Sequence, residues 1–378
     1  MANLPKTQKA LVQEEYGKPL AVKTVLVPEP SSGAVIVKVI YAPIISYMKK
    51  VYNGERKYRY VNPLIPGTSA FGKVVAIGPD ALLLKEGDLV YVDCYIRGRD
   101  DHDAGFLLGL SQGGGQASQK LMEHWINGTF AEYVKAPLEN VYKVDEQKLC
   151  GSPSEGGLGF KLEQLSWWMA ALVPYGGLRS INLQAGEAVI VTPATGNFGS
   201  AAVLVALSMG AGKVIAMGRN AEALSALKKR DKRIETVQMT GDLQTEMEAL
   251  QAHGKADVHF DISPAVSEGA TYLRAAIQSL RHSGRVSLMG GFADTLPIPH
   301  RYIMRNDLTL RGKWMYTRED NLAFTKLLSS GALNIKDVVK VHGIFGLEDW
   351  EKGFDLAWDN GRLGDLVLFA PRGESNKV

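Results

Sequence analysis

Short runs of β-branched and apolar residues mark the N-terminal part of the chain. They are set apart by Gly, Pro, Asp or Ser, and they occupy residues 34–40, 72–77, 88–92 and 130–134. Runs of this length between turn residues are typical of strands. Several short strands in succession predict a small antiparallel barrel or sandwich within residues 8–150.

The pattern changes after residue 160, where residues 162–178 have the pattern of a helix with buried apolar positions. Beyond them, strand-like and helix-like stretches alternate. We predict strands at residues 188–192, 213–217, 256–261, 284–289, 308–312 and 364–369. We predict helices at residues 199–209, 220–230, 268–282 and 318–331. The alternation predicts an α/β fold with a doubly wound parallel sheet.

A turn containing glycines joins the first strand of the alternating region to its helix. The turn and the start of the helix comprise Ala194, Thr195, Gly196, Asn197, Phe198 and Gly199. Alanine therefore stands where a G-x-G-x-x-G pattern has its first glycine. Between a strand and a helix, such a turn lets a pyrophosphate approach the N–H groups of the helix N-terminus. The sequence predicts a dinucleotide site; the alternative is that the glycines only allow close packing of helix against strand.

The residues after the second strand indicate which dinucleotide binds. A site for NAD usually has Asp or Glu here to accept the ribose 2′-OH, but this chain has Gly218, Arg219 and Asn220. A guanidinium forms charge-assisted hydrogen bonds with a 2′-phosphate, so we predict NADPH as the cofactor. Residues 228–230 either reinforce this site or form a solvated helix end.

Two later turns are predicted to contribute to the same site. Ser263 follows the strand at 256–261, and Gly290 and Gly291 follow the strand at 284–289. Because ligands of a parallel sheet bind outside the carboxyl ends of its strands, these residues are expected near the dinucleotide. For the two glycines, an ordinary turn is the alternative.

Composition limits the remaining classes of protein. The chain has 378 residues, a net charge of +3 and two cysteines. Its length suggests two domains, and its charge gives no reason to expect nucleic acid as a partner. Two cysteines exclude a disulfide scaffold and favour a reducing compartment. Without a signal-peptide pattern or an apolar run long enough for a bilayer, we expect a soluble, cytoplasmic protein that does not bind membranes.

Five sequence marks, in order, give the chain a family resemblance. They are Pro66–Gly72 with Val74–Gly78, Glu86–Val90, Gly128–Val134 and Ala185–Val191. With the nucleotide turn, the chain resembles the medium-chain dehydrogenase/reductase superfamily, the group of alcohol dehydrogenases and quinone reductases. The resemblance implies a GroES-like β-barrel catalytic domain and a Rossmann domain. It places the catalytic domain at residues 1–165 and 313–378 and the Rossmann NADPH-binding domain at residues 166–312.

The chain departs from the zinc-dependent members of that superfamily. Where they have a ligand cysteine this chain has Ile45, and where they have Gly-His-Glu it has Gly67, Thr68 and Ser69. Residues 170–177, around the expected third ligand, contain no Cys, His or Asp. Zinc binds imidazole, thiolate or carboxylate groups, so we predict no metal.

Without zinc, another group must polarise the substrate and supply a proton. Tyr47 aligns with the hydroxyl residue that relays protons in zinc-dependent members, and Tyr52 lies near a tyrosine of enoyl-thioester reductases of the superfamily. We take both as candidate catalytic residues, with Ser46 as a weaker one. The alternative for each tyrosine is simple packing at the surface of the lobe. Thr68 and Ser69 are weaker candidates that either take part or fill the place of the metal.

The resemblance leaves three functions open. The leading one is an NADPH-dependent, zinc-independent oxidoreductase that delivers hydride to an activated C=C of a small, apolar or aromatic substrate. The second is a zinc-free carbonyl or imine reductase or alcohol dehydrogenase, and the third is a catalytically silent NADPH-binding protein. As partners we expect a small-molecule substrate and a second copy of the chain, with residues 292–302 supplying an edge strand for a homodimer.

Overall fold

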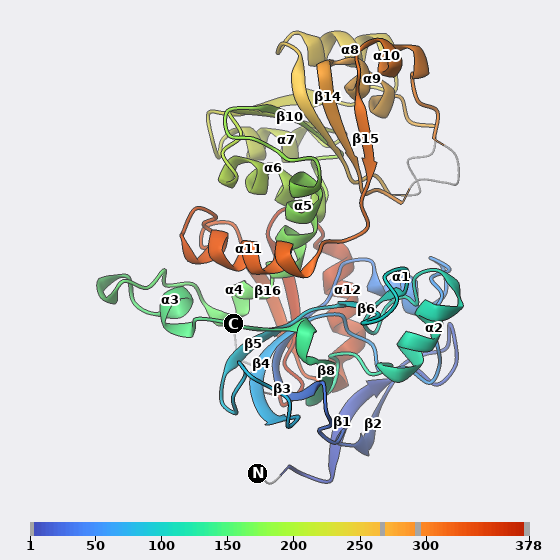
Figure 1. The fold of residues 1–378 in the computed structure, drawn as a ribbon, viewed down its shortest axis with the longest axis vertical. Coiled ribbons are helices and arrows are strands. Elements are labelled where there is room, and N and C mark those ends of the chain that lie inside the picture. Colours follow the sequence, from blue (N-terminus) through green and yellow to red (C-terminus); the bar gives the residue numbers. More distant parts are fainter. Residues whose placement is uncertain (1–3, 265–268, 292–295, 374–378) are drawn as a thin grey trace. The chain divides into compact units, whose positions relative to one another are not determined.

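The computed structural model describes residues 4–264, 269–291 and 296–373, and these residues form two compact units (Figure 1). The first unit comprises Met1–Met169, Ile335–Gly361 and Asp365–Val378. The second comprises Ala170–Asn334 and Arg362–Gly364. Residues 313–334 therefore belong to the second unit by their contacts, whereas the sequence analysis assigned them to the catalytic domain. The predicted domain boundaries stay a prediction.

The first unit is built on a sheet of seven strands. Its order is β16-β17-β3-β4-β5-β9, and β8 also pairs with β3. The strands span Lys340–Phe345 (β16), Asp365–Phe369 (β17), Ala34–Pro43 (β3), Ala70–Ile77 (β4), Leu89–Val92 (β5), Val141–Lys143 (β9) and Tyr133–Pro137 (β8). All pairings except the parallel pair β16–β17 are antiparallel. This agrees with the predicted GroES-like lobe rich in short strands.

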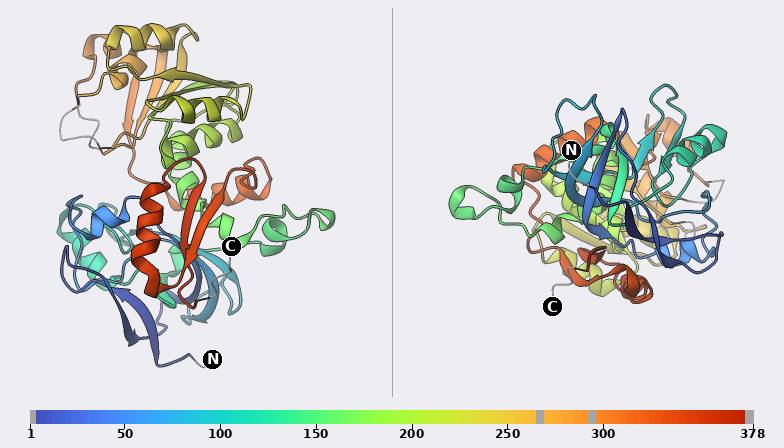
Figure 2. Two further views of the ribbon diagram at one scale, coloured as in Figure 1. Left: turned by 180° about the vertical axis from the view of Figure 1, so that it is seen from behind. Right: turned by 90° about the horizontal axis from the view of Figure 1, so that it is seen from below.

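Smaller elements complete the first unit. Two hairpins form from β1 (Thr7–Val12) with β2 (Ala21–Leu26) and from β6 (Tyr95–Arg97) with β7 (Gly105–Leu107). The helices are α1 (Met48–Tyr52), α2 (Gly115–His124), α3 (Glu146–Cys150), α4 (Leu162–Leu165) and α12 (Trp350–Asp359). Helix α12 runs alongside the two C-terminal strands (Figure 2, left) and buries Phe354 against Phe369 and Phe130.

The second unit is built on a sheet of six parallel strands in the order β12-β11-β10-β13-β14-β15. The strands span Ile234–Gln238 (β12), Lys213–Gly218 (β11), Ala188–Thr192 (β10), Ala256–Asp261 (β13), Leu280–Leu288 (β14) and Thr309–Gly312 (β15). Numbered by their order in the chain, this is the 3-2-1-4-5-6 arrangement of a Rossmann fold. The predicted doubly wound parallel sheet is confirmed.

Helices α6 (Asn197–Ser208), α7 (Ala221–Lys228), α8 (Leu243–Gln251), α9 (Tyr272–Gln278) and α10 (His300–Arg305) lie between these strands in the chain. Helix α5 (Trp168–Ser180) precedes the first of them, and α11 (Arg318–Ser329) follows the last. In Figure 1, α6 and α7 form one group of helices in this unit, and α8, α9 and α10 form another. None of the helices in the described ranges combines the length and the hydrophobicity that crossing a bilayer requires.

Several predicted elements differ from the structure. The strand predicted at 130–134 begins at Tyr133, because pairing with β3 starts there. The helix predicted at 268–282 ends at Gln278, because Leu280 pairs with Ala256 in the sheet. The edge strand predicted at 292–302 is wrong for residues 296–302, where α10 begins at His300; residues 292–295 lie outside the described residues. The sheet ends instead at β15.

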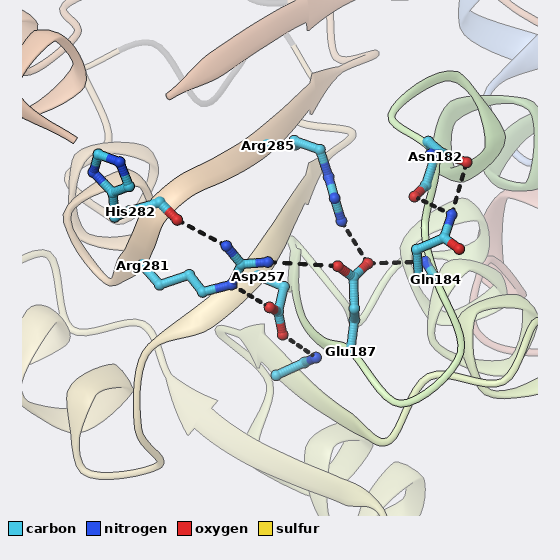
Figure 3. A network of polar contacts seen from close by, with 8 residues as sticks. Asn182, Gln184, Glu187, Asp257, Arg281, His282 and Arg285 are labelled. Carbon is cyan, nitrogen blue, oxygen red and sulfur yellow. Dashed lines mark hydrogen bonds and ion pairs between the residues drawn. The ribbon is translucent and has the colours of Figure 1, made fainter. Parts of the chain in front are cut away.

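A network of charged side chains joins the amino ends of the central strands of the second unit (Figure 3). The Glu187 carboxylate forms ion pairs with Arg285, at 2.5 Å, and with Arg281, at 3.7 Å. Arg281 also pairs with Asp257, whose other carboxylate oxygen accepts the backbone N–H of Ala188 at 2.7 Å. This network fixes β10, β13 and β14 at the end of the sheet opposite their carboxyl ends.

Candidate functional site

The predicted phosphate turn follows the carboxyl end of β10. Ala194 is buried and donates its N–H to the carbonyl of Met217 on β11, at 2.8 Å. Thr195 contacts Gly218, where an added Cβ would lie 2.5 Å from the Thr195 methyl carbon. The turn is thus held against the ends of two neighbouring strands.

The glycines of this turn have two different roles. A Cβ on Gly199 would lie 1.8 Å from the carbonyl oxygen of Pro193, so this glycine allows helix α6 to pack on the turn. A Cβ on Gly196, the N-cap residue of α6, would meet nothing within 4 Å. No side chain caps α6, which begins with Asn197 and Phe198. An uncapped helix start beside open space suits a pyrophosphate, so these residues fit a dinucleotide.

The residues predicted to contact the ribose follow the carboxyl end of β11. Gly218 is the last residue of β11, and Arg219 and Asn220 follow it on the surface. The Asn220 side chain accepts the N–H of Ala223 and so caps α7. Within the described part of the chain, no acidic side chain pairs with the Arg219 guanidinium. Lys228, in contrast, pairs with Glu235 at 2.6 Å.

The two later turns lie together at the same edge of the sheet. Ser263 is fully buried, and a Cβ on Gly290 would lie 2.5 Å from its backbone nitrogen and oxygen. A Cβ on Gly291 would meet nothing within 4 Å. Both turns follow carboxyl ends of strands, the side on which ligands of such sheets bind.

The turn after β13, which the sequence analysis expected near the dinucleotide, also brings buried polar residues of two strands together. Thr192 ends β10 and lies opposite Asp261, which ends β13. The Thr192 hydroxyl is 3.1 Å from an Asp261 carboxylate oxygen and 2.8 Å from Nε2 of His259. Burial raises the pKa of Asp261 to about 6, and burial lowers the pKa of His259 to about 3. The sequence signal that could have revealed this cluster is the presence of two ionisable residues, His259 and Asp261, in a strand that is otherwise largely apolar.

Tyr47, the first candidate catalytic residue, precedes α1 and is half-buried. Its ring stacks under the Arg56 guanidinium, 4.2 Å from the ring centroid, and lies 6.3 Å from the ring of Tyr58. Burial, with the neighbouring Tyr58, raises the pKa of Tyr47 well above its usual value, and Arg56 opposes the rise. Tyr47 therefore stays a protonated hydroxyl that is able to donate.

Tyr52, the second candidate, is committed to the fold. Its buried hydroxyl donates to the carbonyl of Gly109 at 2.7 Å, and its ring stacks on Phe354 at 5.9 Å. Burial raises the pKa of Tyr52 far above its usual value. Ser46 is half-buried beside Gly361, where a Cβ would lie 3.1 Å from the Ser46 hydroxyl.

The residues at the expected metal position do not provide a zinc ligand set. Ile45 and Thr68 are buried, and Thr68 Oγ1 has no hydrogen-bond partner among the described residues. Ser69 Oγ and Cys94 Sγ both contact the thioether of Met169, at 4.0 and 3.8 Å. No three His, Cys, Asp or Glu side chains in the described ranges gather in a metal-binding arrangement. Isoleucine and threonine do not replace thiolate and imidazole, so these residues do not fit zinc.

Comparisons with known proteins match both units. Residues 31–146 match the family model "Alcohol dehydrogenase GroES-like domain", and residues 198–330 match "Zinc-binding dehydrogenase". The chain is 27% identical to acryloyl-coenzyme A reductase of Metallosphaera sedula, covering 95% of this chain and 99% of that protein. It is 26% identical to an alcohol dehydrogenase of Geobacillus stearothermophilus, covering 90% and 94%.

The fold also resembles solved structures. Alcohol dehydrogenase TADH from Thermus sp. ATN1 superposes with a TM-score of 0.76 at 23% identity, covering 96% of this chain and 99% of that one. Two family models cover separate units in the expected order, and the sheet has the Rossmann arrangement. The chain therefore belongs to the medium-chain dehydrogenase/reductase superfamily of oxidoreductases.

Proposed function

We propose that this oxidoreductase uses NADPH, without zinc, to reduce an activated C=C bond in a small apolar or aromatic substrate. The observation that carries the proposal is the side-chain set at the metal position. Ile45, Thr68 and Ser69 supply no zinc ligand of the usual kinds. Any polarisation of the substrate then depends on hydroxyl groups.

A nicotinamide dinucleotide is the cofactor expected for this superfamily, and when bound it supplies the hydride. The open helix start at Gly196 supports a pyrophosphate there, and Gly218 with Arg219 supports a 2′-phosphate. Arg219 is exposed, and the described residues offer its guanidinium no carboxylate partner. These features favour NADPH over NADH.

Hydroxyl groups of the first unit take the part that zinc has in other members. Hydride delivery to a C=C conjugated with a carbonyl leaves an enolate, which needs a hydrogen-bond donor at its oxygen and a proton at its α-carbon. Tyr47 keeps its proton near neutral pH and is half-buried. Thr68 has a buried hydroxyl without a partner in the described part of the chain. The Tyr47 hydroxyl is hydrogen-bonded to another side chain, that of Tyr58, whereas the Tyr52 hydroxyl is held by the backbone carbonyl of Gly109. We therefore assign Tyr47 as the leading donor and Thr68 as a second one.

The relatives support two substrate classes. The reductase of Metallosphaera sedula is named for acryloyl-coenzyme A, a conjugated C=C substrate, and supports the leading proposal. The relative from Geobacillus stearothermophilus is named as an alcohol dehydrogenase and supports carbonyl or alcohol chemistry as the second candidate. The alternatives differ in where hydride is delivered, so one assay distinguishes them.

The test is oxidation of NADPH with matched pairs of substrates that share a carbon skeleton, one an enone and the other the saturated ketone. The proposal predicts turnover of the enone and a product that keeps its carbonyl group. Turnover of the ketone alone would replace the leading proposal with carbonyl reduction. Tight NADPH binding without turnover of any substrate would instead indicate a nucleotide-binding protein that has no catalytic activity.

A further inference from the structure

The buried carboxylate of Asp261 lies at the end of β13, next to β10. Between these two strands the order in which the chain adds strands to the sheet reverses. Asp261 is 1% exposed and stands opposite Thr192 in the register of β13 and β10. Chain connections lead away from these two strands in opposite directions, toward β11 and β12 on one side and β14 and β15 on the other. In sheets of this kind a dinucleotide binds at this switch point, outside the carboxyl ends of the strands.

Neutral donors surround the Asp261 carboxylate. It accepts hydrogen bonds from Ser263 Oγ at 2.6 Å, Thr192 Oγ1 at 3.1 Å and the Ser263 N–H at 3.3 Å. No lysine or arginine of the described residues forms an ion pair with it. A buried carboxylate without a cation beside it is costly to ionise. A cation that binds nearby would therefore favour loss of the carboxyl proton.

Two further residues extend the chain of donors. Because Ser263 donates to Asp261, the Tyr272 hydroxyl donates to Ser263 Oγ, at 2.6 Å. Because Thr192 also donates to Asp261, His259 donates from Nε2 to Thr192, at 2.8 Å. Nδ1 of His259 is then left without a partner among the described residues. The donors therefore point along the chain toward the carboxylate, as they would for an ionised Asp261.

Asp261 is the member of this cluster whose charge changes near neutral pH. Burial raises its pKa to about 6, against the effect of the Ser263 and Thr192 hydrogen bonds. His259, on the same strand, is neutral there because burial lowers its pKa to about 3. Tyr272 on α9 reaches the carboxylate only through its hydrogen bond with Ser263 Oγ. Thr192 on β10 does not titrate, and beyond β14 the carboxylate faces a glycine.

That glycine leaves one side of the carboxylate covered by backbone alone. A Cβ on Gly290 would lie 2.8 Å from Oδ2 of Asp261, and a Cβ on Gly291 would meet nothing within 4 Å. Both glycines follow β14 at its carboxyl end. Among the described residues, a ring bound at this edge would therefore come close to the carboxylate with little protein between them.

We propose that Asp261 is a proton-linked group of the cofactor site, which releases its proton to solvent when the oxidised dinucleotide binds. The inference rests on the proposed cofactor. The oxidised nicotinamide ring carries a positive charge that the reduced ring lacks, and a cation in a poorly solvated site favours an ionised carboxylate. No bond to the cofactor forms or breaks in this step. Asp261 would thus be a positioning residue that favours one redox state of the bound cofactor.

The test is calorimetric titration of the whole protein with NADP⁺ and NADPH from pH 5.5 to 8, in buffers of different ionisation enthalpy. Both forms carry the same phosphates, so the ratio of their dissociation constants isolates the ring charge. A fall of one unit in the pKa of Asp261 on binding gives about a tenfold fall in Kd(NADP⁺)/Kd(NADPH) over the whole titration, of which about threefold lies between pH 5.5 and pH 8. We expect that threefold fall, with more protons released on binding NADP⁺ than on binding NADPH and with the difference greatest near pH 5.5.

Three variants distinguish the effect of the Asp261 carboxylate from the effects of the residues around it. Asp261→Asn is expected to make the ratio independent of pH and to abolish the excess of proton release on binding NADP⁺ over that on binding NADPH, whereas release from the 2′-phosphate is the same for both nucleotides. Ser263→Ala keeps the carboxylate but removes a donor, so the pH dependence moves to higher pH. Ser287→Ala is the control, because its hydroxyl is buried on the neighbouring strand without a hydrogen-bond partner in the described ranges, and it is expected to behave as the parent protein.

A ratio that does not change with pH in the parent protein would overturn the inference. So would a difference in proton release between NADP⁺ and NADPH that persists in Asp261→Asn. If Asp261→Asn does not fold, Ser263→Ala decides: an unshifted pH dependence would overturn the inference. Failure of both nucleotides to bind the folded parent protein is a different result, because it contradicts the proposed function itself.

Discussion

Arg219 is the residue on which the proposed choice of cofactor depends. This residue is exposed after β11, beside Gly218, against which Thr195 of the phosphate turn packs. Arg219→Ala is expected to weaken NADPH binding by about 1.5–3 kcal/mol, as for the loss of a charge-assisted hydrogen bond, with little change for NADH. Titration with both nucleotides measures the difference. Lys228→Ala is the matched control, since the Lys228 ammonium group already pairs with Glu235. If Arg219→Ala weakened the binding of NADPH and NADH equally, Arg219 would not bind the 2′-phosphate.

The two tyrosines provide a second test at the residue scale. Tyr47→Phe removes the proposed donor and is expected to lower turnover by about 100-fold or more, with NADPH affinity unchanged. Tyr52→Phe leaves the Gly109 carbonyl without its donor, so we expect a loss of about 1–2 kcal/mol in unfolding free energy and little change in turnover. Steady-state kinetics and denaturant unfolding measure the two effects. Normal turnover in Tyr47→Phe would remove this residue from the mechanism.

Asp261 is expected to lower the stability of the free protein at high pH. The pKa of Asp261 is about 6 in the folded protein, above the ordinary value of 3.8 that applies to the unfolded chain. The contribution of Asp261 to stability is therefore fully present only below pH 3.8. This contribution is lost as the pH rises through 6. Relative to Asp261→Asn, the parent protein should therefore lose about 2 kcal/mol of unfolding free energy between pH 4 and pH 8. Urea unfolding of both proteins across this range checks the sign, and a parent protein that gains stability instead would contradict the assigned pKa.

At the scale of elements, the charged network of Figure 3 holds three strands in register at the amino end of the second sheet. Glu187 is largely buried and pairs with Arg285 and Arg281. Glu187→Gln leaves both guanidinium groups less well paired, and we expect a loss of about 1–3 kcal/mol in unfolding free energy. Glu235→Gln breaks only the more exposed pair with Lys228 and should cost less than about 1 kcal/mol. Similar losses in both variants would mean that the network contributes nothing beyond a surface pair.

Elements with strong local patterns were predictable from the sequence. The strands at 188–192 and 256–261 were predicted with the bounds that β10 and β13 have. The sequence analysis missed β12 and α8, where polar residues such as Glu235 and Gln238 interrupt the apolar pattern. It also extended a helix through residues 280–282, because the pairing of Leu280 with Ala256 depends on a distant part of the chain.

The candidate site divides in the same way. The turn from Ala194 to Gly199 is local, so its position between a strand and a helix follows from sequence pattern. The bond from Tyr52 to Gly109 joins residues far apart in the chain. Likewise, the contact of Thr192 with Asp261 depends on strand order and register. These non-local contacts fix which hydroxyl groups are committed to the fold, and sequence alone did not reveal them.

At the scale of the whole molecule, the second sheet has two edge strands, β12 and β15. Strand β15 is the one near the segment that the sequence analysis assigned to a dimer edge. An exposed edge strand is able to pair with another copy of itself, so the homodimer predicted from the sequence stays a proposal that now concerns Thr309–Gly312.

The central claim is that a member of this superfamily works with hydroxyl donors where relatives use a metal. The most direct measurement is the zinc content of the purified, active protein together with its NADPH-dependent turnover before and after dialysis against a chelator. The account predicts far less than one zinc per chain and unchanged turnover, because Ile45 and Thr68 offer zinc no ligand. One tightly held zinc per chain, with turnover that disappears on chelation and returns with zinc, would contradict it.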